Sequence, residues 1–160
     1  MATITRVTTT RTTDSAAMTA AEFRCLTEYL GLDQRAVARV LGVEERTVRR
    51  WIAGSHPVPA GAAADLRKVE AFTAEYVAAV VAALIEDGPD DDGQGWLLTF
   101  ATDAAYRTHH PDAEFPASWH RAAMGRVRAA VPWARRWAAR AAGRSRARSA
   151  ARDRPAPCRP

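Results

Sequence analysis

The sequence predicts an all-α fold. Isoleucine is scarce, and no long run alternates Val, Ile or Thr with polar residues, so little sheet is expected. Apolar residues instead recur three and four positions apart, which is the spacing of one helix face. Capping residues and glycines divide this pattern into three short helices, one long helix and a smaller helical C-terminal region.

The three short helices have recognisable start and stop residues. Thr19 and Glu22 match the reciprocal capping pattern for a helix start. Asp33 is the expected cap of the second helix, and Gly42 its end. The third helix occupies residues 44–52. The expected inward positions of the first two helices are Phe23, Leu26, Leu30, Ala36, Val37, Val40 and Leu41, with Thr27 as a further candidate.

A long helix is expected from Ala60 to about Glu86, after a rigid Pro-rich turn. Its apolar stripe contains Leu66, Val69, Phe72 or Thr73, Tyr76, Val77, Val80, Val81 and Leu84. Residues 96–107 predict another helix, with Trp96 and Phe100 one turn apart. Two further helices are expected to start at Pro116 and Pro132. Their expected inward residues are Trp119, Ala123, Val127 and Val131, then Trp133 and Trp137.

Composition divides the chain into five parts. These are a disordered arm (1–17), a helical domain (18–86), an acidic linker (87–95), a helical region suited to dimerisation (96–142) and a disordered basic tail (143–160). Residues 1–134 contain 14 Arg/Lys and 17 Asp/Glu, whereas residues 135–160 contain nine arginines and one acid. A tail of this charge indicates a polyanionic partner.

Several classes of protein are disfavoured. The two cysteines, Cys25 and Cys158, form no CxxC pair, which is typical of a cytoplasmic protein without disulfides. No apolar run predicts a secretion signal or a membrane span. No Gly-rich phosphate loop or nucleophile elbow occurs, so we expect neither an enzyme nor a cofactor. The segment from His109 to Glu114 is a metal-site candidate, but its adjacent ligands would point apart, so no metal is expected.

Residues 34–54, QRAVARVLGVEERTVRRWIAG, resemble the helix-turn-helix of the Xre/Cro repressor class. Gln34 opens the first helix of the motif, as it does in that family. Ala38 matches the small residue where the helices cross. Gly42 matches the turn residue with a positive φ angle. Val48 and Trp51 match the buried positions of the second helix.

The resemblance implies that the second helix of the motif enters the major groove of double-stranded DNA. Carried over by position, Glu45, Arg46 and Arg50 become base-reading residues. Arginine pairs with two acceptors of guanine, so a GC-leaning operator is expected. The implied phosphate or edge contacts are Gln34, Thr47, Arg49 and Ser55. Binding to a symmetric operator implies a homodimer. The resemblance also implies a location at the bacterial nucleoid. No small-molecule substrate is evident from the sequence.

Two acids at the start of this helix depart from the usual pattern. Glu44 stands where Ser or Thr more often caps, although its charge suits the helix dipole. Glu45 could accept a hydrogen bond from cytosine and repel phosphates in a wrong register. We therefore expect this pair to favour selectivity over affinity.

A narrower resemblance is to the YdiL-like regulators, in which an Xre-type domain precedes a smaller dimerisation region. It rests on the PVP sequence after the third helix and on the downstream pair Gly95 and Trp96, and it suggests a phage-encoded repressor. The alternatives are an excisionase-like winged helix, a phage small-terminase assembly protein, an antitoxin that represses its own operon, and a helical hairpin with a polar face.

Overall fold

The computed structural model describes residues 17–138 of the chain, with side chains described as far as Arg135. The predicted basic tail and nearly all of the predicted N-terminal arm lie outside these residues. Within the described range the protein is mostly helical. Its elements are α1 (Ala20–Tyr29), α2 (Gln34–Val40), α3 (Glu45–Ile52), α4 (Ala60–Asp87), β1 (Gly95–Thr99), α5 (Asp103–His109), α6 (Ala117–Ala130) and β2 (Ala134–Ala138).

The predicted helix starts are confirmed for the first two helices. Thr19 and Glu22 form the complete capping box of α1, in which each side chain accepts a hydrogen bond from the other residue's backbone N–H. The Asp33 carboxylate accepts a hydrogen bond of 2.7 Å from the backbone N–H of Ala36. Both caps satisfy amides that the first helical turn leaves without a backbone partner.

The first three helices end in the same way. Gly31, Gly42 and Gly54 follow α1, α2 and α3 with φ angles of 68°, 63° and 71°. In each case the N–H of the residue after the glycine donates to the carbonyl five residues earlier, as from Val43 to Ala38 at 2.9 Å. This is the Schellman motif, which favours glycine because other residues strain at positive φ. The predicted stop at Gly42 is thus confirmed.

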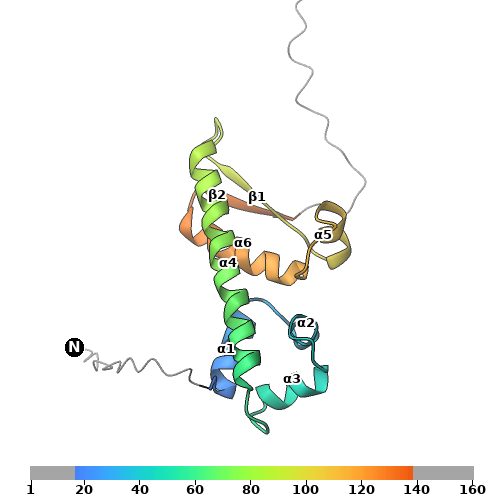
Figure 1. Cartoon of the computed structure of the whole chain (residues 1–160). Coiled ribbons are helices and arrows are strands. Elements are labelled where there is room, and N and C mark those ends of the chain that lie inside the picture. Colours follow the sequence, from blue (N-terminus) through green and yellow to red (C-terminus); the bar gives the residue numbers. More distant parts are fainter. Residues whose placement is uncertain (1–16, 139–160) are drawn as a thin grey trace, which may run out of the picture.

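Helix α4 runs the length of the described structure (Figure 1). Its first half packs against the bundle of α1, α2 and α3, where Ala63, Leu66 and Val69 are buried. Its second half packs against α6 and β1 through its partly buried Val77, Val80, Val81 and Leu84. At the position left open between Phe72 and Thr73, Thr73 is buried and Phe72 is 49% exposed.

Trp119 of α6 connects the C-terminal region to the bundle of α1, α2 and α3. It belongs to the apolar core of the α1–α3 bundle, although it lies in the C-terminal region. Its indole N–H donates to the Thr73 hydroxyl at 2.9 Å, and that hydroxyl donates to the carbonyl of Val69 at 2.6 Å. These two buried hydrogen bonds hold α6 against α4, because losing them would leave the indole N–H and the hydroxyl without partners.

Two segments predicted as helices are strands. Residues 95–99 form β1 in place of the start of the expected helix 96–107, and α5 begins only at Asp103. Residues 134–138 form β2 in place of the expected last helix. The strands pair in parallel, with Gly95 opposite Ala134 and Thr99 opposite Ala138. The C-terminal region is therefore mixed rather than purely helical.

The burial of β1 explains this correction. Leu97 and Thr99 are buried and Leu98 is exposed, so the segment follows the two-residue period of a strand. The one-turn spacing of Trp96 and Phe100 matched a helix equally well, since short apolar runs fit both periods. The partner strand, β2, follows β1 in the chain only after α5 and α6. Parallel strands need a long connection of this kind.

Candidate nucleic-acid interface

Helix α3 is held in place by two buried side chains on one face. Val48 is fully buried, and Trp51 is 5% exposed. The Trp51 ring meets the Phe23 ring of α1 edge to face, with centroids 5.7 Å apart and planes at 81°. Ala38 of α2 is also buried in this core. These positions are the packing residues that the sequence predicted.

The opposite face of α3 carries charge. Glu45, Arg46 and Arg49 are exposed, whereas Thr47 and Arg50 are half-buried. The ion pairs between Arg24 and Glu28 and between Lys68 and Asp65 both lie outside α3. The three arginines of this eight-residue helix therefore make no ion pair among the described side chains. Such a surface attracts polyanions.

The start of α3 has an acidic but incomplete cap. Glu44 is the N-cap residue in extended conformation, and its side chain makes no capping hydrogen bond. The expectation that Glu44 is a poor cap is therefore confirmed. Its charge and that of Glu45 still lie beside the amide-rich end of the helix, where negative charge is stabilising.

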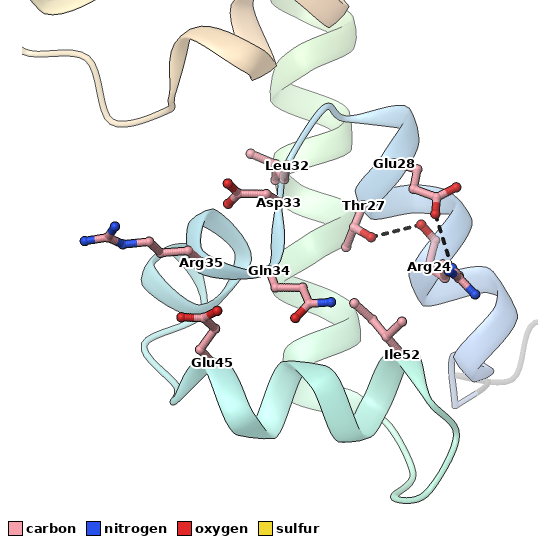
Figure 2. A pocket seen from close by; sticks show the side chains of 9 residues that line it. All are labelled: Arg24, Thr27, Glu28, Leu32, Asp33, Gln34, Arg35, Glu45 and Ile52. Carbon is pink, nitrogen blue, oxygen red and sulfur yellow. Dashed lines mark hydrogen bonds and ion pairs between the residues drawn. The ribbon is translucent and has the colours of Figure 1, made fainter. Parts of the chain in front are cut away.

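A cavity of about 560 Å³ adjoins α1, α2 and α3 (Figure 2). Gln34, at the first position of α2, lines it together with Glu45, at the first position of α3. Figure 2 shows the side chain of Gln34 pointing into the space beside Ile52, while Arg35 extends away from α2. The structure thus brings Gln34 and Glu45, predicted as separate contacts, to one edge of the motif.

Arg35 was missed by the sequence reasoning. It is exposed, lines the same cavity and has no ion-pair partner among the described side chains. The signal that could have found it is its position directly after Gln34, in the first turn of the motif's first helix. Arg35 adds a positive charge on the side of α2 next to the start of α3.

Ser55 is exposed just beyond the glycine that ends α3. Its hydroxyl donates to the carbonyl of Arg50 at 3.2 Å, and its backbone N–H donates to the same carbonyl at 3.1 Å. In this geometry the Ser55 hydroxyl satisfies a carbonyl at the C-terminal end of α3. A phosphate contact by Ser55 would require its side chain to rotate, so it is the weakest of the predicted contacts.

The C-terminal region contributes His109, His110 and His120 to the described structure. Within residues 17–135, no three His, Cys, Asp or Glu side chains lie where they could hold a metal ion together. Among the described helices, none is both long and apolar enough to cross a membrane. His120 is buried among aromatic rings, and its Nδ1 has no hydrogen-bond partner. Burial lowers the pKa of His120 to about 4, and His110 and Arg121 add to this effect.

No protein-family model matches the chain, and no curated protein matches it significantly.

Proposed function

We propose that the protein is a sequence-specific regulator that binds double-stranded DNA through α3. The observation that carries this proposal is the arginine surface of α3. The helix is anchored by Val48 and Trp51, while Arg46, Arg49 and Arg50 have no ion-pair partner among the described side chains. A short helix of this kind fits the major groove and offers donors to the acceptors of guanine.

Roles follow from position along α3. Arg46 and Glu45 lie in its first turn, which is the part that contacts base edges when such a helix enters the groove. Arg50 lies one turn further along the same face as Arg46. Gln34 and Arg35 start the neighbouring helix, where they would bind the phosphate backbone and set the register of α3.

We further propose that the protein acts as a homodimeric repressor. A pair of identical reading helices recognises a two-fold symmetric operator with half-sites about one helical turn of DNA apart. Much of the apolar stripe of α4 packs within the chain against α6 and β1. The remaining surface of the C-terminal region is therefore a better candidate for the dimer contact than that stripe.

Selection of bound sequences from random double-stranded DNA tests the proposal. The expected result is one enriched, GC-leaning, two-fold symmetric site. Failure to enrich any sequence, at a salt concentration where nonspecific binding is weak, would contradict sequence-specific binding. Sedimentation of the free protein gives a separate check on the assembly: a dimer supports a regulator, and a large ring would instead favour an assembly role.

A further inference from the structure

A second cavity, of about 410 Å³, lies between α4, α5 and the segment that leads into α6. Aromatic side chains supply most of its lining, and two carboxylates complete it. The lining residues are Phe72, Tyr76, Tyr106, His110, Asp112, Ala113, Glu114, Phe115 and Trp119. The volume lies within the usual range for small-molecule sites, which are concave, mostly apolar and have few polar groups.

The aromatic wall is built into the core rather than loosely attached. Trp119 is held by its hydrogen bond to Thr73. Its ring centroid lies 4.7 Å from that of Phe115 and 5.1 Å from that of Tyr76. Side chains fixed in this way lose little conformational freedom when a ligand binds, so the cavity is largely preformed.

The lining of the cavity contains two acidic residues. Asp112 and Glu114 are exposed, and neither has an ion-pair partner among the described side chains. Among the residues that the structure describes, no lysine or arginine lines the cavity. Behind the lining, the ring of His120 lies 4.9 Å from that of Tyr106. Because its pKa is lowered to about 4, His120 is uncharged at neutral pH and does not repel a cation.

We propose that this cavity binds a small organic cation of the quaternary-ammonium class. The faces of aromatic rings carry negative potential, and cages of such rings bind quaternary ammonium groups by cation–π attraction. The two carboxylates supply the opposite charge at the same site. An anionic ligand is disfavoured by both features, and a neutral ligand would use only the apolar part of the lining.

The test uses choline and its uncharged analogue 3,3-dimethylbutan-1-ol, which differ mainly in the charged nitrogen. Ligand-observed NMR titrations of the full chain are made without DNA, so that their outcome is independent of the proposed function. Choline is expected to bind roughly fivefold more tightly than the alcohol, from the strength of cation–π attraction. Equal binding of the two probes, or binding of neither, would overturn the proposal.

Variants locate the binding. Asp112→Asn with Glu114→Gln removes two carboxylates from exposed positions, so the fold should be preserved. The preference for choline should fall to the part that the aromatic rings supply. Phe72→Leu keeps an apolar side chain but removes one ring, and should weaken choline binding about threefold. The matched control is Asp91→Asn with Asp92→Asn, in the exposed turn after α4. An equal loss in this control would mean unspecific charge attraction.

The chain itself contains another source of organic cations. Seven arginines lie in residues 139–160, and Ala138 pairs with Thr99, shortly before α5 begins. The titration is therefore repeated on a full chain with these arginines replaced by glutamine. Similar choline affinity in both proteins supports a free ligand. Choline binding that appears only in the replaced chain would overturn that assignment in favour of an internal arginine.

Discussion

Arg46 and Arg50 occupy the same face of α3 but differ in their surroundings. Arg46 is exposed, whereas Arg50 is half-buried beside the end of the helix. A bidentate contact to guanine discriminates against another base by about 1–3 kcal/mol, whereas a phosphate contact discriminates little. The two kinds of contact are therefore separable by measuring affinity on more than one DNA sequence.

Replacing Arg46 with alanine is expected to relax selection at one base pair of the operator. The affinity ratio between the preferred base and its competitors should fall by about one order of magnitude, within the span of a bidentate contact. Competition binding on single-base operator variants measures this ratio. The matched control is Arg128→Ala, an exposed arginine of α6. A uniform loss over all sequences would show that Arg46 contacts phosphate instead.

Glu45 is expected to lower nonspecific affinity. Its carboxylate is exposed at the start of α3. On the proposed function, it would approach the DNA backbone in a wrong register and be repelled by it. Glu45→Gln should therefore bind random-sequence DNA more tightly by a few-fold and lose part of its operator preference. Glu86→Gln, at the far end of α4, is the control. Unchanged nonspecific affinity in the Glu45 variant would reduce its role to a helix-start charge.

His120 couples stability to pH. Its folded pKa, about 4, lies below the ordinary histidine pKa of 6.5, so the unfolded chain binds the proton more readily. The free energy of unfolding should therefore be constant above pH 6.5 for this group and fall by up to about 3 kcal/mol as the pH decreases to 4. Denaturant unfolding at a series of pH values measures it.

The control for this pH effect is the exposed His109. His120→Leu should flatten the pH dependence between 6.5 and 4, whereas His109→Leu should leave it unchanged. If the His120 variant keeps the original slope, the acid sensitivity belongs to other groups, such as the carboxylates.

At the scale of elements, Gly95 decides whether β1 can pair with β2. A Cβ added at Gly95 would collide with the ring of Trp133, and the Gly95 N–H donates to the Trp133 carbonyl at 3.2 Å. Gly95→Ala is expected to destabilise the protein by about 1–3 kcal/mol, the usual cost of overpacking. Thermal and denaturant unfolding measure this change.

Gly61 provides the opposite case within the same chain. It lies in the first turn of α4, and a Cβ there would meet no atom within 4 Å. Gly61→Ala should stabilise the protein by up to about 1 kcal/mol, because alanine has the higher helix propensity. If both substitutions destabilise equally, the ring of Trp133 is not the cause of the Gly95 effect.

The helices were more predictable than the strands for a physical reason. A helix start at Thr19 or a stop at Gly42 is determined by hydrogen bonds within five residues. The pairing of β1 with β2 depends on residues about forty positions apart. The short apolar segments at 96–100 and 133–137 fit either period until that partner is known. Local reasoning therefore succeeded for α1–α4 and failed for β1 and β2.

At the scale of the whole molecule, α3 and the segment that follows α4 lie at opposite ends of α4 (Figure 1). Helix α3, with its three arginines, lies near the first residues of α4. Glu86 and Asp87 lie at its last turn, followed by Asp90, Asp91 and Asp92. The oxygens of Asp90 accept hydrogen bonds from Gln94 and Trp96, so this acidic segment is an organised turn. A molecule polarised in this way would approach a polyanion with α3 leading.

The C-terminal tail is expected to add affinity without selectivity. Deleting residues 143–160 removes six arginines and one acid. Binding to operator and random DNA should weaken by a similar factor, and the plot of log affinity against log salt should flatten, because fewer counterions are released. Deleting residues 1–16, which contain Arg6 and Arg11, is a control of similar length. An unchanged salt slope after the tail deletion would contradict the prediction.

The sequence by itself determined the helical bundle of residues 18–86, the buried positions Val48 and Trp51, and the candidate contacts along α3. These features depend on local capping, periodicity and a motif of fixed spacing. Only the tertiary structure decided the parallel strands and the aromatic cavity around Trp119. Each of these requires segments distant in the chain to meet, and the packing that brings them together is not encoded in any single stretch.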